Sequence, residues 1–214
     1  MNILFILAHP DDEAFGPAGT IIHLAKTNKV TVISLCNGAR PGNEAVAADR
    51  EAAFIQSCTA MGAMWKIYER PDCSLTYDAT LKSVETLIDH YKPDAVYTHN
   101  ISDIHRDHRL VAECCVVACR PKPESTVMEL YMTEITASTD WSFGQIEPVF
   151  KPNVYVDITN YIEIKEMLLS LYQTELYKFP DARSVESMRT TAMFRGKQAG
   201  FEYAEAFSLV FKRI

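Results

Sequence analysis

The stretch NILFILAHPDDE, residues 2–13, decides the fold of this chain. Its first seven residues form a short apolar run, which is typical of a buried β-strand. Residues 30–36 (VTVISLC) form a second such run, rich in β-branched residues, and residues 18–28 between them have apolar side chains at helical spacing. A strand, a helix and a strand in this order predict a right-handed βαβ unit. We therefore expect the acidic residues after position 8 to follow the first strand of a parallel sheet.

The alternation of strand and helix patterns continues through the first half of the chain. Further strands are expected at 64–69, 94–99 and 127–133, and helices at 44–61, 79–91 and 108–119. Beyond residue 137 the pattern predicts a loop at 138–152, helices at 162–177 and 185–198, and a closing strand at 207–211. This order predicts an α/β fold, Rossmann-like, with a mostly parallel sheet flanked by helices on both faces. We interpret 1–214 as a single domain, with a Rossmann-like core in 1–136 and substrate-pocket and closing elements in 137–214.

Composition excludes several classes of protein. The 214 residues include 21 Lys and Arg against 28 Asp and Glu, a net charge of −7, so the basic surface of a general nucleic-acid binder is absent. The longest apolar run, 3–8, is too short to span a membrane, and no secretory signal precedes it, so we expect a cytoplasmic location. The six cysteines include no C-x-x-C pair, which argues against a cysteine-rich zinc site.

Two polar clusters follow predicted strands. The first is His9-Pro10-Asp11-Asp12-Glu13, and the second is the run NISDIHRDH at 100–108. Because ligands of parallel sheets bind outside the carboxyl ends of the strands, we expect the clusters to meet at one edge. Buried carboxylates need a cation, which an arginine or a metal ion must provide. Two imidazoles and one carboxylate are the usual protein ligands of a catalytic zinc ion, with a fourth position left for water.

The spacing within each cluster suggests which residues could bind a metal ion and which could act as a general base. Asp11 and Asp12 are adjacent, so in an extended segment their side chains point in opposite directions, and one can bind a metal while the other acts as a general base. His105 and His108 are three residues apart, close to one helical turn, so both can face one cavity.

The segment AHPDDE (8–13), followed by HRDH (105–108), resembles the LmbE/PIG-L family of zinc-dependent sugar N-deacetylases. The resemblance extends over most of the chain. It includes Arg50-Glu51 in the second predicted helix, Asp72 after the third strand, and the late segment from Arg195-Gly196 to Phe207. It implies a Rossmann-like domain that holds zinc and hydrolyses N-acetyl groups of glucosamine-containing substrates.

The resemblance also implies residue roles. The metal ligands would be His9, Asp12 and His108. Asp11 would be the general base on the zinc-bound water, and His105, protonated, would stabilise the oxyanion or protonate the leaving amine. Asp107 would orient an imidazole, and Arg50 and Asp72 would contact sugar hydroxyls.

The expected function is a metal-dependent hydrolase that removes the N-acetyl group from an N-acetylglucosamine-type sugar or conjugate. Hydrolysis of another small N-acyl amide, such as N-formyl on a sugar or nucleotide-sugar, is the alternative. A non-haem iron oxygenase is a more distant one, because two histidines and a carboxylate also form that iron site. Zinc is the expected ion, with Fe²⁺ or another divalent metal left open. The expected partner is a small N-acylated amino sugar, with no nucleic acid or membrane, and a homo-oligomer is left open.

Several of these residues also have a simpler structural interpretation. Arg50 could make a helix-surface ion pair, and Asp72 could be a turn residue. We expect Asp103 to be an acid that stabilises a helix N-terminus, and His99 to pack at a strand end. The later arginines are expected on a solvated face, namely Arg183, Arg189 and Arg195.

Overall fold

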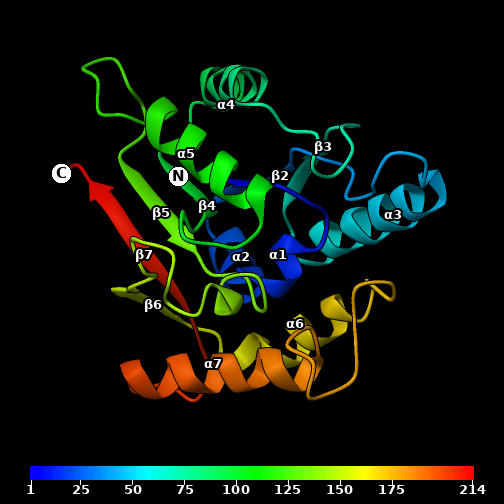
Figure 1. Cartoon of the computed structure of the whole chain (residues 1–214). Coiled ribbons are helices and arrows are strands. Elements are labelled where there is room, and N and C mark those ends of the chain that lie inside the picture. Colours follow the sequence, from blue (N-terminus) through cyan, green and yellow to red (C-terminus); the bar gives the residue numbers. More distant parts are fainter.

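Seven strands form one sheet in the computed structural model, which describes all 214 residues (Figure 1). The strand order is β3-β2-β1-β4-β5-β7-β6. The first five strands of the chain pair in parallel: β1 (Asn2–Leu7), β2 (Lys29–Ser34), β3 (Met64–Ile67), β4 (Ala95–His99) and β5 (Glu129–Thr133). The last two, β6 (Val154–Asp157) and β7 (Ala204–Lys212), are antiparallel to their neighbours. The predicted Rossmann-like fold with a mostly parallel sheet is confirmed.

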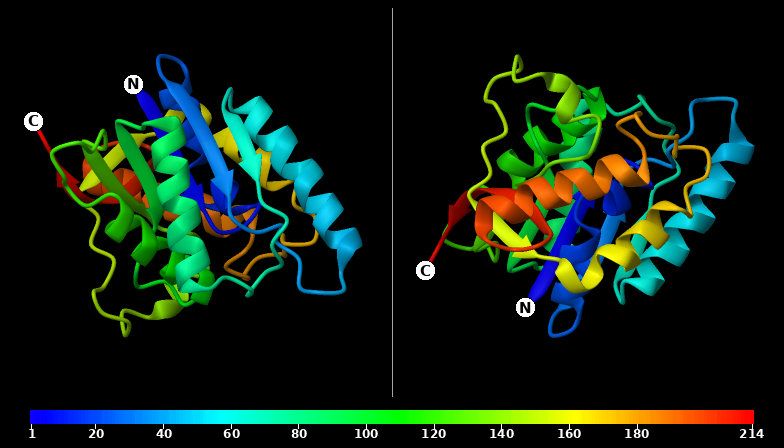
Figure 2. Two further views of the ribbon diagram at one scale, coloured as in Figure 1. Left: turned by 90° about the horizontal axis from the view of Figure 1, so that it is seen from above. Right: turned by 90° about the horizontal axis from the view of Figure 1, so that it is seen from below.

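Helices cover both faces of the sheet, as predicted (Figure 2). One face carries α4 (Tyr77–Tyr91) and α5 (Arg106–Ala118). The other carries α2 (Ala18–Ala25), α3 (Glu44–Ala60), α6 (Ile162–Leu169) and α7 (Val185–Ala199). The remaining helical turns are α1 (Asp12–Phe15), η1 (Asp140–Ser142) and η2 (Thr159–Tyr161). None of these helices has the length and apolar character needed to cross a bilayer.

The apolar run of β1 explains why both faces must be covered. Ile3, Phe5 and Leu7 belong to one core cluster, whereas Leu4 and Ile6 belong to the cluster on the opposite face. Side chains alternate along a strand, so a continuous apolar run buries both faces of the central strand. Such a strand is stable only between two helical layers.

The strand order places a topological switch point between β1 and β4. From β1 the sheet continues through β2 on one side and through β4 on the other, so these two central strands form a topological switch point. Ligands of such sheets bind outside the carboxyl ends of the strands at this point. The motif 9–13 follows β1 and the motif 100–108 follows β4.

The C-terminal part differs from the sequence prediction in two places. The helix expected over 162–177 ends at Leu169, because Tyr172 turns inward and its hydroxyl donates to Glu13 Oε1 at 2.5 Å. The chain then runs through an irregular segment, 170–184, before α7. The strand β6 was not predicted; it has only four residues and lies at the sheet edge, where a short segment gives little periodic signal.

A buried ion pair connects this C-terminal part to the core. Glu205 of β7 accepts hydrogen bonds from the backbone N–H groups of Gly19 and Thr20, at 2.8 and 2.7 Å, and from Lys165 Nζ at 2.7 Å. We expect Glu205→Ala to lower the free energy of unfolding by about 3–5 kcal/mol, because it leaves a buried ammonium without its partner. Urea denaturation measures this loss. The matched control Glu124→Ala, at an exposed loop position, should change stability by less than about 0.5 kcal/mol; equal effects of the two substitutions would contradict the prediction.

Candidate metal centre

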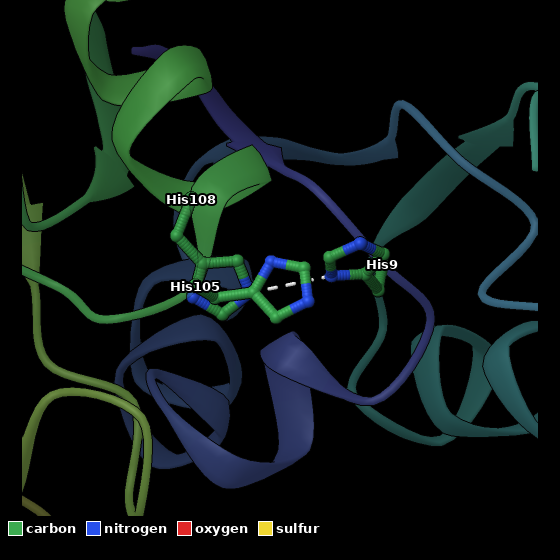
Figure 3. Close-up of side chains that lie close together, drawn as sticks. All are labelled: His9, His105 and His108. Carbon is green, nitrogen blue, oxygen red and sulfur yellow. Dashed lines mark hydrogen bonds between the residues drawn. The ribbon is translucent and has the colours of Figure 1, made fainter. Parts of the chain in front are cut away.

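The ends of β1 and β4 bring the two polar motifs into contact. Figure 3 shows the imidazole of His9, which follows β1, facing those of His105 and His108 at the start of α5. His9 Nδ1 lies 3.2 Å from His108 Nε2, and Asp12 Oδ1 lies 3.2 Å from the same nitrogen. The third separation, from His9 Nδ1 to Asp12 Oδ2, is 3.6 Å. His9, Asp12 and His108 are all buried.

The second ring nitrogen of His9 and that of His108 each face a carboxylate. His9 Nε2 lies 3.0 Å from Asp72 Oδ1 and 3.3 Å from Asp107 Oδ2, and His108 Nδ1 lies 3.1 Å from Asp103 Oδ2. Each carboxylate favours a proton on the nitrogen that it faces. The lone pairs of His9 Nδ1 and His108 Nε2 are thereby directed towards each other and towards Asp12. Carboxylates commonly orient metal-binding histidines in this way.

The two other histidines of the cluster, His99 and His105, each accept a backbone N–H with one ring nitrogen. His99 Nε2 accepts the backbone N–H of Ala8 at 2.8 Å, and the His99 ring stacks on His108 with 3.9 Å between centroids. His105 Nδ1 accepts the backbone N–H of Asp107 at 3.2 Å, which places the proton of the neutral ring on Nε2. His99 packs at the strand end as expected.

The donor set fits one divalent cation. Ligands at the Zn–N and Zn–O distances of proteins, arranged tetrahedrally, lie about 3.3–3.5 Å apart. The separations of His108 Nε2 from His9 Nδ1 and from Asp12 Oδ1 are close to this value, and His9 Nδ1 meets the other Asp12 oxygen, Oδ2, at 3.6 Å. Burial alone lowers the pKa of His108, but Asp12 and Asp103 raise it to about 9. The same negative charge attracts a metal ion. Three overlapping groups of side chains could each hold an ion, because within each group one donor atom per residue lies within 4.8 Å of the others. The groups are His9-His105-His108, His9-Asp72-His105-Asp107 and Asp12-His99-His108, so His108 is the residue that connects His9 with Asp12.

A cavity of about 120 Å³ opens over this cluster, and no apolar residue lines it. Seven of the eight site residues expected from the sequence line this cavity: His9, Asp11, Asp12, Arg50, Asp72, His105 and His108. The eighth, Asp107, lies behind His9. Three further lining residues were not predicted: Ser138, Glu175 and Arg183. The structure therefore brings all eight predicted residues to one place.

Arg50 and Arg183 both contact the carboxylate of Glu175. Arg50, on α3, pairs with Glu175 rather than with a neighbour on its own helix, so the surface ion pair considered for it does not form. Arg183 Nη2 lies 2.5 Å from Asp11 Oδ2 and 3.4 Å from Glu175 Oε2. Its side chain is 24 % exposed, so the solvated face expected for it is wrong.

The two other late arginines differ from each other. Arg195 is only 15 % exposed and makes a two-pronged contact with Glu134, so the expectation of a solvated face is wrong for it as well. Arg189 is 39 % exposed and pairs with Glu166, as expected of a surface arginine.

Asp103 differs most from its expected role. The N-cap of α5 is His105, and the Asp103 carboxylate is fully buried. It accepts hydrogen bonds from the hydroxyls of Ser138 at 2.7 Å and Thr139 at 3.0 Å, and it contacts His108. The expectation of a helix-terminus acid is therefore only part of its role: Asp103 Oδ1 accepts the backbone N–H of His105 at 2.7 Å, whereas Oδ2 faces His108 and the two hydroxyls. No sequence signal distinguishes the two roles, because the partner loop lies 35 residues away.

The protonation expected of His105 also differs. Burial, together with the neighbouring His108 and His9, lowers the pKa of His105 to about 4. The ring is therefore neutral at pH 7, contrary to the protonated form expected from the sequence. A neutral ring with its proton on Nε2 can still donate a hydrogen bond into the cavity.

The fold and site define a Rossmann-like α/β protein with a histidine–carboxylate cluster at the switch point of its sheet. A family model described as GlcNAc-PI de-N-acetylase (PIG-L) matches residues 4–119, more than half of the chain. The chain belongs to the PIG-L family, which confirms the resemblance seen in the sequence.

Solved structures of similar shape include deacetylases and a hydratase. N,N'-diacetylchitobiose deacetylase from Pyrococcus horikoshii has a TM-score of 0.78 and 21% identity, over 98% of this chain and 83% of that one. GalB, the 4-carboxy-2-hydroxymuconate hydratase of Pseudomonas putida KT2440, has a TM-score of 0.76 and 20% identity, over 100% and 97%. The zinc-inhibited form of the teicoplanin deacetylase Orf2 has a TM-score of 0.78 and 12% identity, over 100% and 99%. At these identities the likeness shows the fold, and two kinds of reaction occur on it.

Proposed function

We propose that this protein is a metal-dependent hydrolase that removes the N-acetyl group from an N-acetylglucosamine-type sugar or conjugate. The observation that carries the proposal is the convergence of His9, Asp12 and His108 beside Asp11 in a wholly polar cavity. Membership of the PIG-L family and the deacetylases among the structural neighbours support this reaction over others.

His9, Asp12 and His108 would hold the metal ion, for which we propose zinc. Such an ion supplies a water molecule that is activated at neutral pH and a Lewis acid for the acyl carbonyl. Asp103, Asp107 and Asp72 would keep the two imidazoles in the orientation that presents their lone pairs.

Asp11 would act as the general base. Its side chain lines the cavity, and Arg183 engages only the Oδ2 oxygen, so Oδ1 can accept a proton from the attacking water. The backbone of Asp11 has φ 118°, which a non-glycine residue rarely adopts and which is common at functional sites.

His105 would stabilise the reaction through a hydrogen bond in the same cavity. Its Nε2–H can donate a hydrogen bond to the carbonyl oxygen as negative charge develops there. The proton that Asp11 takes from the water would then pass to the leaving nitrogen. Arg50 and Asp72 line the same cavity, where their charged groups can bind sugar hydroxyls.

An amine-release assay tests the proposed function. The purified, zinc-loaded protein is incubated with N-acetylglucosamine, N,N'-diacetylchitobiose, a UDP-linked N-acetylhexosamine and an N-formyl analogue, with and without a chelator. We expect acetate and free amine in equal amounts, and no reaction after chelation. Release of formate alone would favour the N-formyl alternative. Oxygen consumption by the iron-loaded protein without amine release would favour the oxygenase, and the absence of both reactions would contradict the proposal.

The contact between Asp103 and His108 leads to a prediction about metal affinity. We expect Asp103→Asn to weaken metal binding by about 10–100-fold, because the amide no longer provides a full negative charge to orient and polarise the imidazole. Competition with a zinc-sensitive chelating dye measures the affinity. Asp89→Asn, at an exposed position of α4, is the matched control, and an affinity of Asp103→Asn equal to that of this control would contradict the prediction.

A further inference from the structure

The irregular segment 170–184 reaches the candidate general base through one side chain. Arg183 lies 172 residues after Asp11 in the sequence, yet its Nη2 donates to Asp11 Oδ2 at 2.5 Å. No other side chain donates to this carboxylate. The contact therefore joins the C-terminal segment directly to the group that would take a proton.

The guanidinium is held firmly before any substrate arrives. Arg183 Nε donates to the backbone oxygen of Glu175 at 3.0 Å, and its planar group lies 4.4 Å from the centre of the Phe15 ring. Its own backbone is fixed as well, because Arg183 N donates to Asp181 Oδ1 at 2.8 Å and Arg183 O accepts from Tyr177 N at 2.9 Å. A rigid donor of this kind fixes the orientation of the group to which it binds.

The two carboxylate oxygens of Asp11 have different surroundings in this arrangement. Oδ2 is bound to Arg183, whereas Oδ1 has no protein partner and belongs to a side chain that lines the cavity. We infer that Arg183 is a positioning residue, which by holding Oδ2 turns Oδ1 towards the reacting water. The inference rests on the proposed function and extends it, since it assigns a catalytic effect to a segment outside both sequence motifs.

A second interpretation of Arg183 is that it binds the substrate directly. Its side chain also lines the cavity, as do those of His105 and His108. The two interpretations predict different kinetics. A substrate-binding arginine mainly affects KM and acts independently of Asp11, whereas a positioning residue affects kcat and has no effect once the base is absent.

The test uses four variants of the zinc-loaded full chain, with N-acetylglucosamine or N,N'-diacetylchitobiose as the probe, whichever reacts faster. We expect Arg183→Gln to lower kcat about 100-fold, with KM within about threefold of the wild type and unchanged metal content. The kcat of Arg183→Lys should be about tenfold higher than that of Arg183→Gln, because lysine restores the positive charge but not the planar guanidinium group. Arg189→Gln, which removes a surface arginine paired with Glu166, should retain full activity.

The decisive measurement is the fourth variant, Asp11→Asn/Arg183→Gln. We expect its kcat to equal that of Asp11→Asn alone within about threefold, because the arginine acts only through the carboxylate. Multiplication of the two losses, a change in KM alone, or full activity of Arg183→Gln would each overturn the inference and leave the proposed function intact. A wild-type protein that releases no amine would instead overturn the proposed function, and this inference with it.

Discussion

Replacement of His108 by alanine is expected to abolish metal binding and to lower kcat/KM by at least about 10⁴-fold. The imidazole Nε2 lies 3.2 Å from both His9 Nδ1 and Asp12 Oδ1, so its loss removes the donor that lies closest to both of the others. Two protein ligands hold zinc far more weakly than three, because catalytic zinc sites use three. Without the ion, the reaction loses both the activated water and the Lewis acid, each of which contributes several kcal/mol to catalysis.

Metal content after dialysis against a weak chelator checks this prediction, and acetate release is measured on the same samples. The control is His90→Ala, which removes an exposed imidazole from the last turn of α4 and should change neither quantity. Removal of His108 leaves Asp12 and Asp103 without their shared partner, so far-ultraviolet circular dichroism is needed to show that the variant is folded. A folded His108→Ala protein with full metal stoichiometry would remove His108 from the ligand set.

The fold could be predicted because its signals are local. Strands such as 2–7 and 29–34 are short apolar runs, and the intervening helices show a 3.6-residue period. The handedness rule and the burial of parallel sheets then leave few possible arrangements. Parallel strands end at one edge of the sheet, which is why two motifs about a hundred residues apart could be expected at the same edge. The direct pairing of β1 with β4, which brings the motifs into contact, is seen only in the structure.

The segment that covers the site could not be predicted in this way. The helical pattern continues past Leu169, but the structure breaks it because the buried Tyr172 hydroxyl bonds to the buried Glu13. This contact links residues 159 positions apart, and no periodicity encodes it. The position of Arg183 depends on where α6 ends, so its pairing with Asp11 could not be predicted either.

Sequence patterns also could not predict which carboxylate orients which histidine. Asp103 and Asp107 occupy similar places in the HRDH region, and either could cap a helix or orient an imidazole. The structure directs Asp103 to His108 and Asp107 to His9, and this choice depends on side-chain rotamers and on the hydroxyls of the 138–139 loop. Spacing alone contains no information about those rotamers.

Asp11→Asn is expected to retain the metal and to lower kcat about 10³-fold. The ligand cluster does not depend on Asp11, because Asp12 is the carboxylate that contacts His108. Asparagine has nearly the same shape, and its amide oxygen can still accept the hydrogen bond from Arg183. The NH₂ group would then take the place of Oδ1 and present a donor to the cavity where the reaction needs a proton acceptor. Loss of a general base typically costs 10²–10⁴-fold.

Steady-state amine release and metal analysis of the same preparation check this prediction. Asp89→Asn is the matched control, since it makes the same chemical change at an exposed position of α4 and should leave both quantities at the wild-type level. The combination of full metal content with a large loss of kcat distinguishes a base from a ligand, because a ligand variant such as His108→Ala loses both together. Wild-type turnover in Asp11→Asn would exclude Asp11 as the base, and loss of the metal would place Asp11 among the ligands instead.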